Sequence, residues 1–183
     1  MPRISTHHVA ILVAGLGLMA GLGSALAQQD KYAVKVPGGL GFSDFRGYES
    51  WQTIAVSQAD SLGLIEVIVG DPAAVAAYAS GIPANGKPFP DGVRLAKIHW
   101  KAVKSKDAPT ATTIPGALDD VDFMLKDSKR FSGNGGDGWG YAQFNYDPAK
   151  STFSPLGTGA QCGTSCHALA KAKDYVFTVY GRR

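Results

Sequence analysis

The chain has 183 residues, of which 45% are hydrophobic, and its 18 basic residues are nearly balanced by 15 acidic ones. This length suits one domain with a sizeable hydrophobic core. Lysine and arginine are scattered, with no basic stripe interleaved with aromatic residues, so we expect no nucleic-acid partner.

The N-terminal segment 1–27 predicts a secretory signal peptide. Arg3 precedes an apolar run over residues 9–22, and the segment ends in Ala-Leu-Ala at Ala27, a cleavage site of the A-x-A type. The run is shorter than the roughly 20 residues of a transmembrane helix, and a retained membrane anchor is the alternative. We therefore expect a periplasmic protein whose mature domain is residues 28–183.

The middle of the chain alternates strand patterns with turn signals. Ser43 and Asp44 are candidate N-caps of a short helix. A second short helix is predicted where Asp71 can act as N-cap, Pro72 as first residue and Gly81 as terminator. Strands are predicted at 51–58, 62–71, 93–103, 117–127 and 138–147, and loops at 82–92, 104–116 and 128–138. Together these elements predict a single α+β domain with a mostly antiparallel β-sheet and a few short helices.

The stretch CGTSCH, residues 162–167, carries the clearest chemistry. A histidine directly after a cysteine, with a second cysteine just upstream, is typical of covalent haem attachment. The usual motif has two residues between the cysteines, whereas Cys162 and Cys166 are separated by three. We expect the extra residue to bulge out at the flexible Gly163, and the motif to open a helix over residues 166–173.

Other uses of these cysteines stay open. Disulfides persist in exported proteins, and Cys162 and Cys166 are the only cysteines of the chain. A bond between them would close a small loop and add little stability, and it would give His167 no role. Zinc would need a fourth ligand besides these three residues, and His99 is the only other histidine of the mature chain. A free dithiol is the last alternative.

The order of these elements resembles a known family. "GVRLAKIHW", "DFMLKDSKRF", a strand containing tryptophan, and the late motif followed by "KDYVFTVYG" are similar to the cytochrome P-460 and cytochrome c′-beta superfamily. The resemblance runs from about Trp51 to the C-terminus. It implies an antiparallel sheet that carries one covalent haem c, in a homodimer. The P-460 members oxidise hydroxylamine, and the c′-beta members bind nitric oxide and similar diatomic gases.

Two further positions follow from this resemblance. Lys97 matches the lysine that P-460 enzymes join covalently to the haem rim, and the c′-beta branch lacks this cross-link. Asp122 matches the acidic residue above the open iron position, usually glutamate. From the residues alone, Lys97, His99 and Lys101 can also form a solvated strand face. Asp122 can likewise belong to an exposed acidic strand end with Asp119 and Asp120.

Met124 and His99 are the mature residues that could supply a sixth iron ligand besides His167. Met124 has the character of a core residue, so we expect an open or water-ligated iron, which permits ligand binding or catalysis.

The preferred interpretation is an exported mono-haem protein that oxidises hydroxylamine or a related small nitrogen compound. Cys162 and Cys166 would hold the porphyrin, His167 the iron, Lys97 would tune the ring and Asp122 would handle protons. An unidentified periplasmic protein would accept the electrons. The alternatives are a c′-beta-like protein that binds nitric oxide without turnover, and a haem-free domain with a Cys162–Cys166 disulfide.

Overall fold

The structure is a computed structural model that describes residues 28–133, 138–157 and 159–181. The predicted signal peptide lies outside the described residues. The side chains of residues 159–162, Cys162 among them, also lie outside the description.

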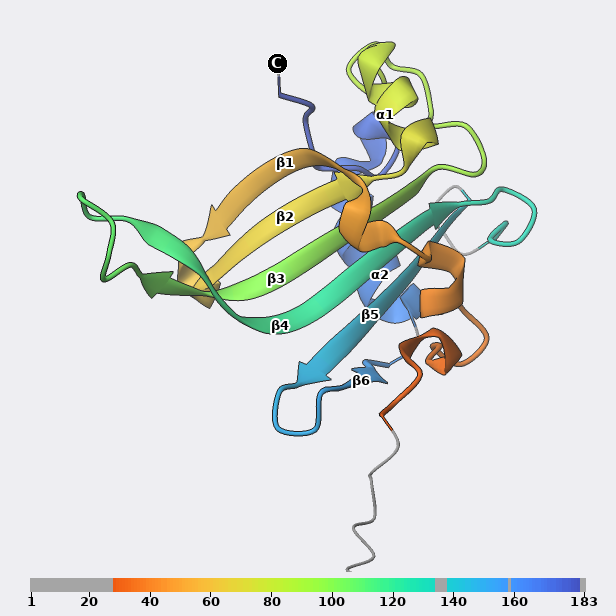
Figure 1. Cartoon of the computed structure of the whole chain (residues 1–183). Helices are drawn as coiled ribbons and strands as arrows, with labels where there is room; N and C mark the ends of the chain where they lie inside the picture. Colours follow the sequence, from red (N-terminus) through yellow and green to blue (C-terminus); the bar gives the residue numbers. More distant parts are fainter. Residues whose placement is uncertain (1–27, 134–137, 158, 182–183) are drawn as a thin grey trace, which may run out of the picture.

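The described residues form one six-stranded antiparallel sheet, in which every strand pairs with the strands next to it in sequence. Short connections suffice for such neighbours, which gives the simple up-and-down order of Figure 1. The predicted α+β fold with a mostly antiparallel sheet is confirmed. The strands are β1 (Gln52–Ala59), β2 (Leu64–Gly70), β3 (Arg94–Lys104), β4 (Thr113–Lys126), β5 (Trp139–Asp147) and β6 (Thr152–Pro155).

The sheet is larger than the sequence patterns predict. β6 was not predicted, and it adds four residues to the free edge of β5. The segment 104–116 was expected to be a loop, yet β3 continues to Lys104 and β4 begins at Thr113, where the two residues pair. Ladder pairing in a long hairpin overrides the polar, proline-containing composition of this segment.

The helices are short and most are single 3-10 turns. The predicted helix after Asp71 is confirmed as α1 (Pro72–Ala79), and the Asp71 carboxylate accepts a hydrogen bond from the Ala74 amide. The predicted helix near Ser43 is instead the 3-10 turn η2 (Phe42–Phe45), which begins after Gly41. Asp44 is therefore not its N-cap but reaches back to accept from the Gly41 amide. Further 3-10 turns are η1 (Lys31–Ala33), η3 (Tyr48–Ser50) and η4 (Asp60–Leu62).

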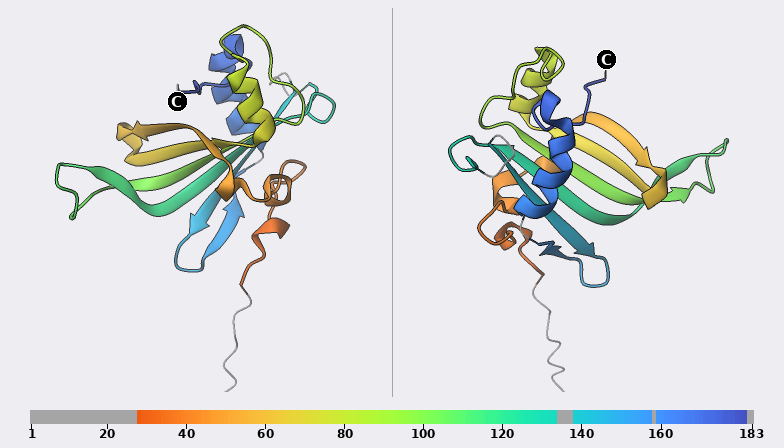
Figure 2. Two further views of the ribbon diagram at one scale, coloured as in Figure 1. Left: turned by 45° about the horizontal axis from the view of Figure 1, so that its top comes forward. Right: turned by 180° about the vertical axis from the view of Figure 1, so that it is seen from behind.

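Both faces of the sheet are covered, by segments from opposite ends of the described chain (Figure 2). The N-terminal turns pack phenylalanines against one face, where Phe42 and Phe45 meet Phe123 of β4. On the other face lie α1, α2 (Gly159–His167), the 3-10 helix η5 (Ala168–Lys173) and the C-terminal segment. None of the helices in the described part of the chain has the length and apolar character of a membrane span.

The cysteine motif lies inside α2 and does not open a helix, which corrects the sequence prediction. α2 ends at His167, and the chain continues as η5. The predicted bulge at Gly163 is also wrong, because the helix is continuous there. Gly163 is needed for packing: a Cβ at this position would lie 2.2 Å from the Cγ of Tyr141 on β5.

Candidate functional site

A cavity of about 600 Å³ lies between α2, the C-terminal segment and the sheet face that they cover. Its volume is in the range of sites for cofactors and small molecules. Neighbouring strands contribute matching positions, since Lys97 on β3 pairs with Ile68 on β2 and with Asp122 on β4. Its lining includes Lys97, Asp122, Met124, Gly163, Cys166, His167 and Phe177. Four of the five predicted site residues therefore meet in one cavity; the fifth, Cys162, has its side chain outside the description.

His167 has the setting of a metal-binding histidine. Its Nδ1 lies 2.6 Å from the Tyr175 carbonyl oxygen, so this nitrogen carries the proton and Nε2 keeps its lone pair. Burial lowers the pKa of His167, and the nearby positive charge of Lys97 lowers it further, although the bond to Tyr175 opposes the shift. The ring packs between Tyr141 and Phe177. His167 is thus held neutral and oriented, as an imidazole ligand must be.

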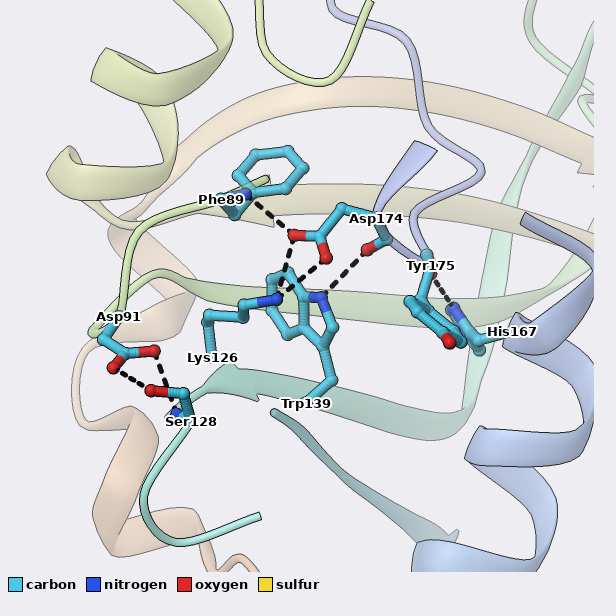
Figure 3. A network of polar contacts seen from close by, with 8 residues as sticks. All are labelled: Phe89, Asp91, Lys126, Ser128, Trp139, His167, Asp174 and Tyr175. Atoms are coloured by element: carbon cyan, nitrogen blue, oxygen red, sulfur yellow. Dashed lines mark hydrogen bonds and ion pairs between the residues drawn. The ribbon is translucent and has the colours of Figure 1, made fainter. Parts of the chain in front are cut away.

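A buried ion pair holds the turn that orients His167 (Figure 3). Lys126 Nζ lies 2.8 Å from Asp174 Oδ1, and the two side chains are only 6% and 9% exposed. Asp174 also accepts from the Phe89 amide, while its carbonyl accepts from Trp139 Nε1 at 2.9 Å. Asp174 and Tyr175 both have positive φ, so this backbone needs such support. The next residue, Tyr175, presents the carbonyl to His167.

The helix explains the unusual spacing of the cysteines. Residues four apart on an α-helix lie on one face, one turn from each other, so positions 162 and 166 face the same side. Cys166 is a free, exposed cysteine in the described part of the structure. Neither Cys166 nor His167 belongs to a cluster of three potential metal ligands within the described side chains, so zinc gains no support here.

Lys97 lines the cavity, and its side chain is 36% exposed. Its Nζ lies 2.8 Å from Glu66 Oε1, and Ser57 Oγ donates to Glu66 Oε2 at 2.7 Å. Burial would raise the pKa of Glu66, but the hydrogen bonds from Lys97 and Ser57 outweigh it and hold the pKa below its usual value. Lys97 is thus an ion-paired residue of the cavity wall that keeps some contact with solvent.

Asp122 stands beside Lys97 in the cavity wall. Its side chain is 34% exposed, yet Oδ1 is buried and accepts no hydrogen bond from the described residues. Burial raises the pKa of Asp122 to about 6, with Asp120 and Glu66 adding to the shift and His99 and Lys97 opposing it. A carboxyl group that titrates near neutral pH and faces a cavity is suited to proton transfer.

His99 is buried beneath the cavity, only 5% exposed, and so does not belong to a solvated face. Its Nδ1 contacts Asp120, which is also buried. Its Nε2 lies 3.5 Å from Glu66 Oε1 and 3.9 Å from Asp122 Oδ2. The interpretation of Asp120 and Asp122 as part of an exposed acidic strand end is thus wrong. Asp119, by contrast, does pair with the exposed Lys101 at the surface.

Several residues of this site were not predicted as functional. The sequence predicts only a strand at Glu66. Strand pairing in the sheet places Glu66 opposite Ser57 on β1 and opposite His99 on β3. A glutamate between β-branched neighbours was the available signal, since a charge in a buried strand needs partners. Asp174 and Tyr175 lie in "KDYVFTVY", a motif that supported the family resemblance but did not predict a role for either residue.

The donor set fits a covalently held haem. The helix face carries an accessible thiol at Cys166, and an oriented neutral imidazole follows at His167. The cavity beside them offers aromatic and aliphatic side chains and two carboxylates, Glu66, which is paired with Lys97, and Asp122. Such a site can bind a large planar ligand, leave one side of it open and exchange protons there.

Comparison with known proteins identifies one family. A family model described as Cytochrome P460 matches residues 45–178. A search of curated proteins finds no match. The matched range contains every residue of the cavity described above except Val179.

Proposed function

Because the chain belongs to the cytochrome P460 family, whose members are haem-binding cytochromes, we propose that it is a covalent haem c protein that oxidises hydroxylamine or a related small nitrogen compound. The observation that carries this proposal is the meeting of Lys97, Asp122, Cys166 and His167 in one cavity.

In this proposal α2 provides the attachment site. The thiols of Cys162 and Cys166 would form the two thioether bonds from one helix face, and His167 Nε2 would bind the iron. The bound haem would supply an open coordination position and take up the electrons of the substrate. The Tyr175 carbonyl fixes the His167 ring through Nδ1 and keeps Nε2 free for the metal.

Asp122 is the proposed proton acceptor. Oxidation of hydroxylamine removes protons together with electrons, and a positioned base contributes roughly 10²–10⁴-fold to such a step. With its pKa raised to about 6 by burial, Asp122 is ionised at neutral pH and still basic enough to take a proton. Activity should therefore be lost as the pH falls through about 6.

Steady-state oxidation of hydroxylamine with an artificial electron acceptor tests this function. Asp122→Ala should lose most turnover, by roughly 10²-fold or more, while nitric oxide binding is retained. Asp122→Glu should keep or raise the rate, since it extends the carboxylate by one C–C bond of about 1.5 Å. Asp119→Asn, on the neighbouring surface pair, is the matched control and should leave the rate unchanged. Equal rates in the parent and in Asp122→Ala would remove Asp122 from the mechanism. No turnover in any variant would favour a gas-binding protein of the c′-beta type.

Lys97 is the proposed second attachment point. Peptide mapping should find Lys97 and the peptide containing Cys166 on the same haem. Lys97→Ala should shift the absorption spectrum towards that of an ordinary five-coordinate haem c, and Lys101→Ala, with its exposed side chain, should not. An unchanged spectrum in Lys97→Ala would place the protein on the c′-beta side of the family.

A further inference from the structure

A second row of polar side chains begins in the cavity wall, and the proposed function does not account for it. It runs across four strands, because Ser57 on β1 pairs with Glu66 on β2, Glu66 with His99 on β3, and His99 with Asp120 on β4. His99, Glu66 and Asp120 are all buried, whereas Ser57 is exposed. Glu66 and Ser57 also line the cavity, so the row leads from buried His99 and Asp120 to the exposed Ser57 on the cavity wall.

His99 is arranged to pass a proton. Its Nδ1 is engaged by the Asp120 carboxylate, so Nδ1 carries a proton and Nε2 presents a lone pair. Nε2 is buried and has no hydrogen-bond partner among the described residues. Its nearest acidic neighbours are Glu66 Oε1 at 3.5 Å and Asp122 Oδ2 at 3.9 Å. A carboxylate that orients an imidazole, whose other nitrogen faces the reacting group, is a recurring arrangement for proton transfer.

A base in a cavity must lose the proton that it has accepted before it can accept another. Asp122 can hold one proton, and every turnover of the proposed reaction releases more than one. His99 Nε2 lies 3.9 Å from Asp122 Oδ2, within one small side-chain movement or one water of contact.

We propose that Asp122, His99, Glu66 and Ser57 form a proton relay that ends at the exposed hydroxyl of Ser57, with Asp120 as the residue that orients His99. This inference rests on the proposed function, because it assigns the exit route of the protons that Asp122 collects.

The steps of the relay balance in protons. Asp122, once protonated, gives its proton to His99 Nε2, and the resulting imidazolium is stabilised by Asp120 and Glu66. The Nε2–H proton then passes to Glu66 Oε1, which returns His99 to its neutral form. The protonated Glu66 carboxyl then rotates to present this proton to the Ser57 oxygen. The Ser57 hydroxyl, which donates to Oε2 at 2.7 Å in the resting structure, turns away and passes its own proton to solvent.

The charged groups around His99 allow this cycle. Glu66 faces it from β2, Asp120 and Asp122 from β4, and Lys97 lies on its own strand and pairs with Glu66. The three carboxylates stabilise a transient imidazolium, while Lys97 keeps Glu66 from holding the proton permanently.

His99→Gln in the holoprotein tests the relay, because glutamine keeps a donor for Asp120 but cannot accept and release a proton. Hydroxylamine turnover should fall roughly tenfold or more. The rate should recover as the concentration of a mobile buffer, Mes, is raised, since the buffer can carry the proton that His99 no longer carries. Parent and Asp119→Asn should show no dependence on buffer concentration. Asp120→Asn should give an intermediate rate and a weaker buffer dependence.

A titration provides the second readout and does not depend on turnover. The Asp122 carboxyl, followed by carbon-13 NMR, should show a higher pKa in His99→Gln than in the parent, because the interaction with His99 lowers the pKa of Asp122 and is lost in this variant. An identical titration, or a His99→Gln rate equal to the parent without buffer dependence, overturns the relay and leaves the proposed function standing. Absence of turnover in the parent overturns the proposed function, and the titration then decides alone whether Asp122 and His99 are coupled.

Discussion

At the scale of single residues, the site depends on where each polar side chain is neutral and where it is charged. Burial and the nearby charge of Lys97 lower the pKa of His167 and favour its neutral form, while the Tyr175 carbonyl orients the ring, as an iron ligand requires. Glu66 is kept ionised by Lys97 and Ser57. Asp122 lies between these extremes, and it is the group whose protonation changes near neutral pH.

The raised pKa of Asp122 has a consequence for stability. The folded protein keeps the Asp122 proton up to about pH 6, whereas the unfolded chain loses it near pH 4. Stability contributed by this group is therefore full below pH 4, falls between pH 4 and 6, and is absent above pH 6. Asp122→Asn removes the charge and should be more stable than the parent by roughly 1–2 kcal/mol at pH 7.5, after allowing for partial exposure.

Urea denaturation at pH 4 and pH 7.5 measures this difference. At pH 4 the advantage of Asp122→Asn should largely disappear. Asp107→Asn, at an exposed position in the β3–β4 loop, should show no such change between the two pH values. An equal effect of Asp122→Asn at both pH values would mean that the carboxyl is not perturbed by burial.

At the scale of elements, the contact with β5 sets the position of α2, the helix that carries the cysteine motif. Gly163 lies against the Tyr141 ring, and any Cβ there would overlap it. Gly163→Ala should therefore destabilise the protein by about 1–3 kcal/mol through overpacking, although alanine is worth up to about 1 kcal/mol more than glycine at an open helical position. Gly181→Ala is the control, because a Cβ there meets nothing within 4 Å. Thermal unfolding of both variants gives the comparison, and a stabilised Gly163→Ala would show that α2 does not pack this closely.

The turn between η5 and the C-terminal segment is the second element that the site needs. Asp174→Asn keeps a residue that tolerates positive φ but removes the charge that pairs with buried Lys126. We expect a loss of about 3 kcal/mol in the free energy of unfolding, as for other broken buried pairs. Asp147→Asn, which breaks the exposed pair with Lys150, should change it little.

The same substitution should be visible at His167. A displaced Tyr175 carbonyl weakens the bond to Nδ1, so the reduction potential and the ligand-field bands of the holoprotein should shift in Asp174→Asn and not in Asp147→Asn. An unchanged spectrum with lowered stability would limit Asp174 to a structural role.

At the scale of the whole molecule, we propose an exported protein that matures by two covalent events. Cleavage after Ala27 should leave Gln28 as the first residue, and attachment should add one haem. Intact mass of the periplasmic protein should therefore equal residues 28–183 plus one haem, and its colour should survive extraction with acidic acetone. A colourless mature protein that lacks only two hydrogens would support the disulfide alternative instead. Dimerisation and the identity of the electron acceptor are further expectations from the resemblance, and analytical ultracentrifugation checks the first.

Local sequence patterns were sufficient to predict those features of this protein that depend on neighbouring residues. Alternating strand residues, the Asp71-Pro72 helix start and the CGTSCH motif are local signals, so the fold class, α1 and the candidate attachment site could be predicted. The family resemblance, carried by short motifs, was sufficient to single out Lys97 and Asp122.

Features that depend on strand register and on contacts between distant segments could be assigned only from the folded structure. The alternation of residues along β3 is the same whether the face with Lys97 and His99 is open to solvent or covered. Only the packing of α2 and the C-terminal segment on this face shows that a cavity lies there. The partners of His99 come from β2 and β4, and pairing across strands has no signature in one strand alone. The three-residue gap between the cysteines likewise looked irregular until helix geometry placed both positions on one face, because the period of 3.6 residues accommodates a spacing of four.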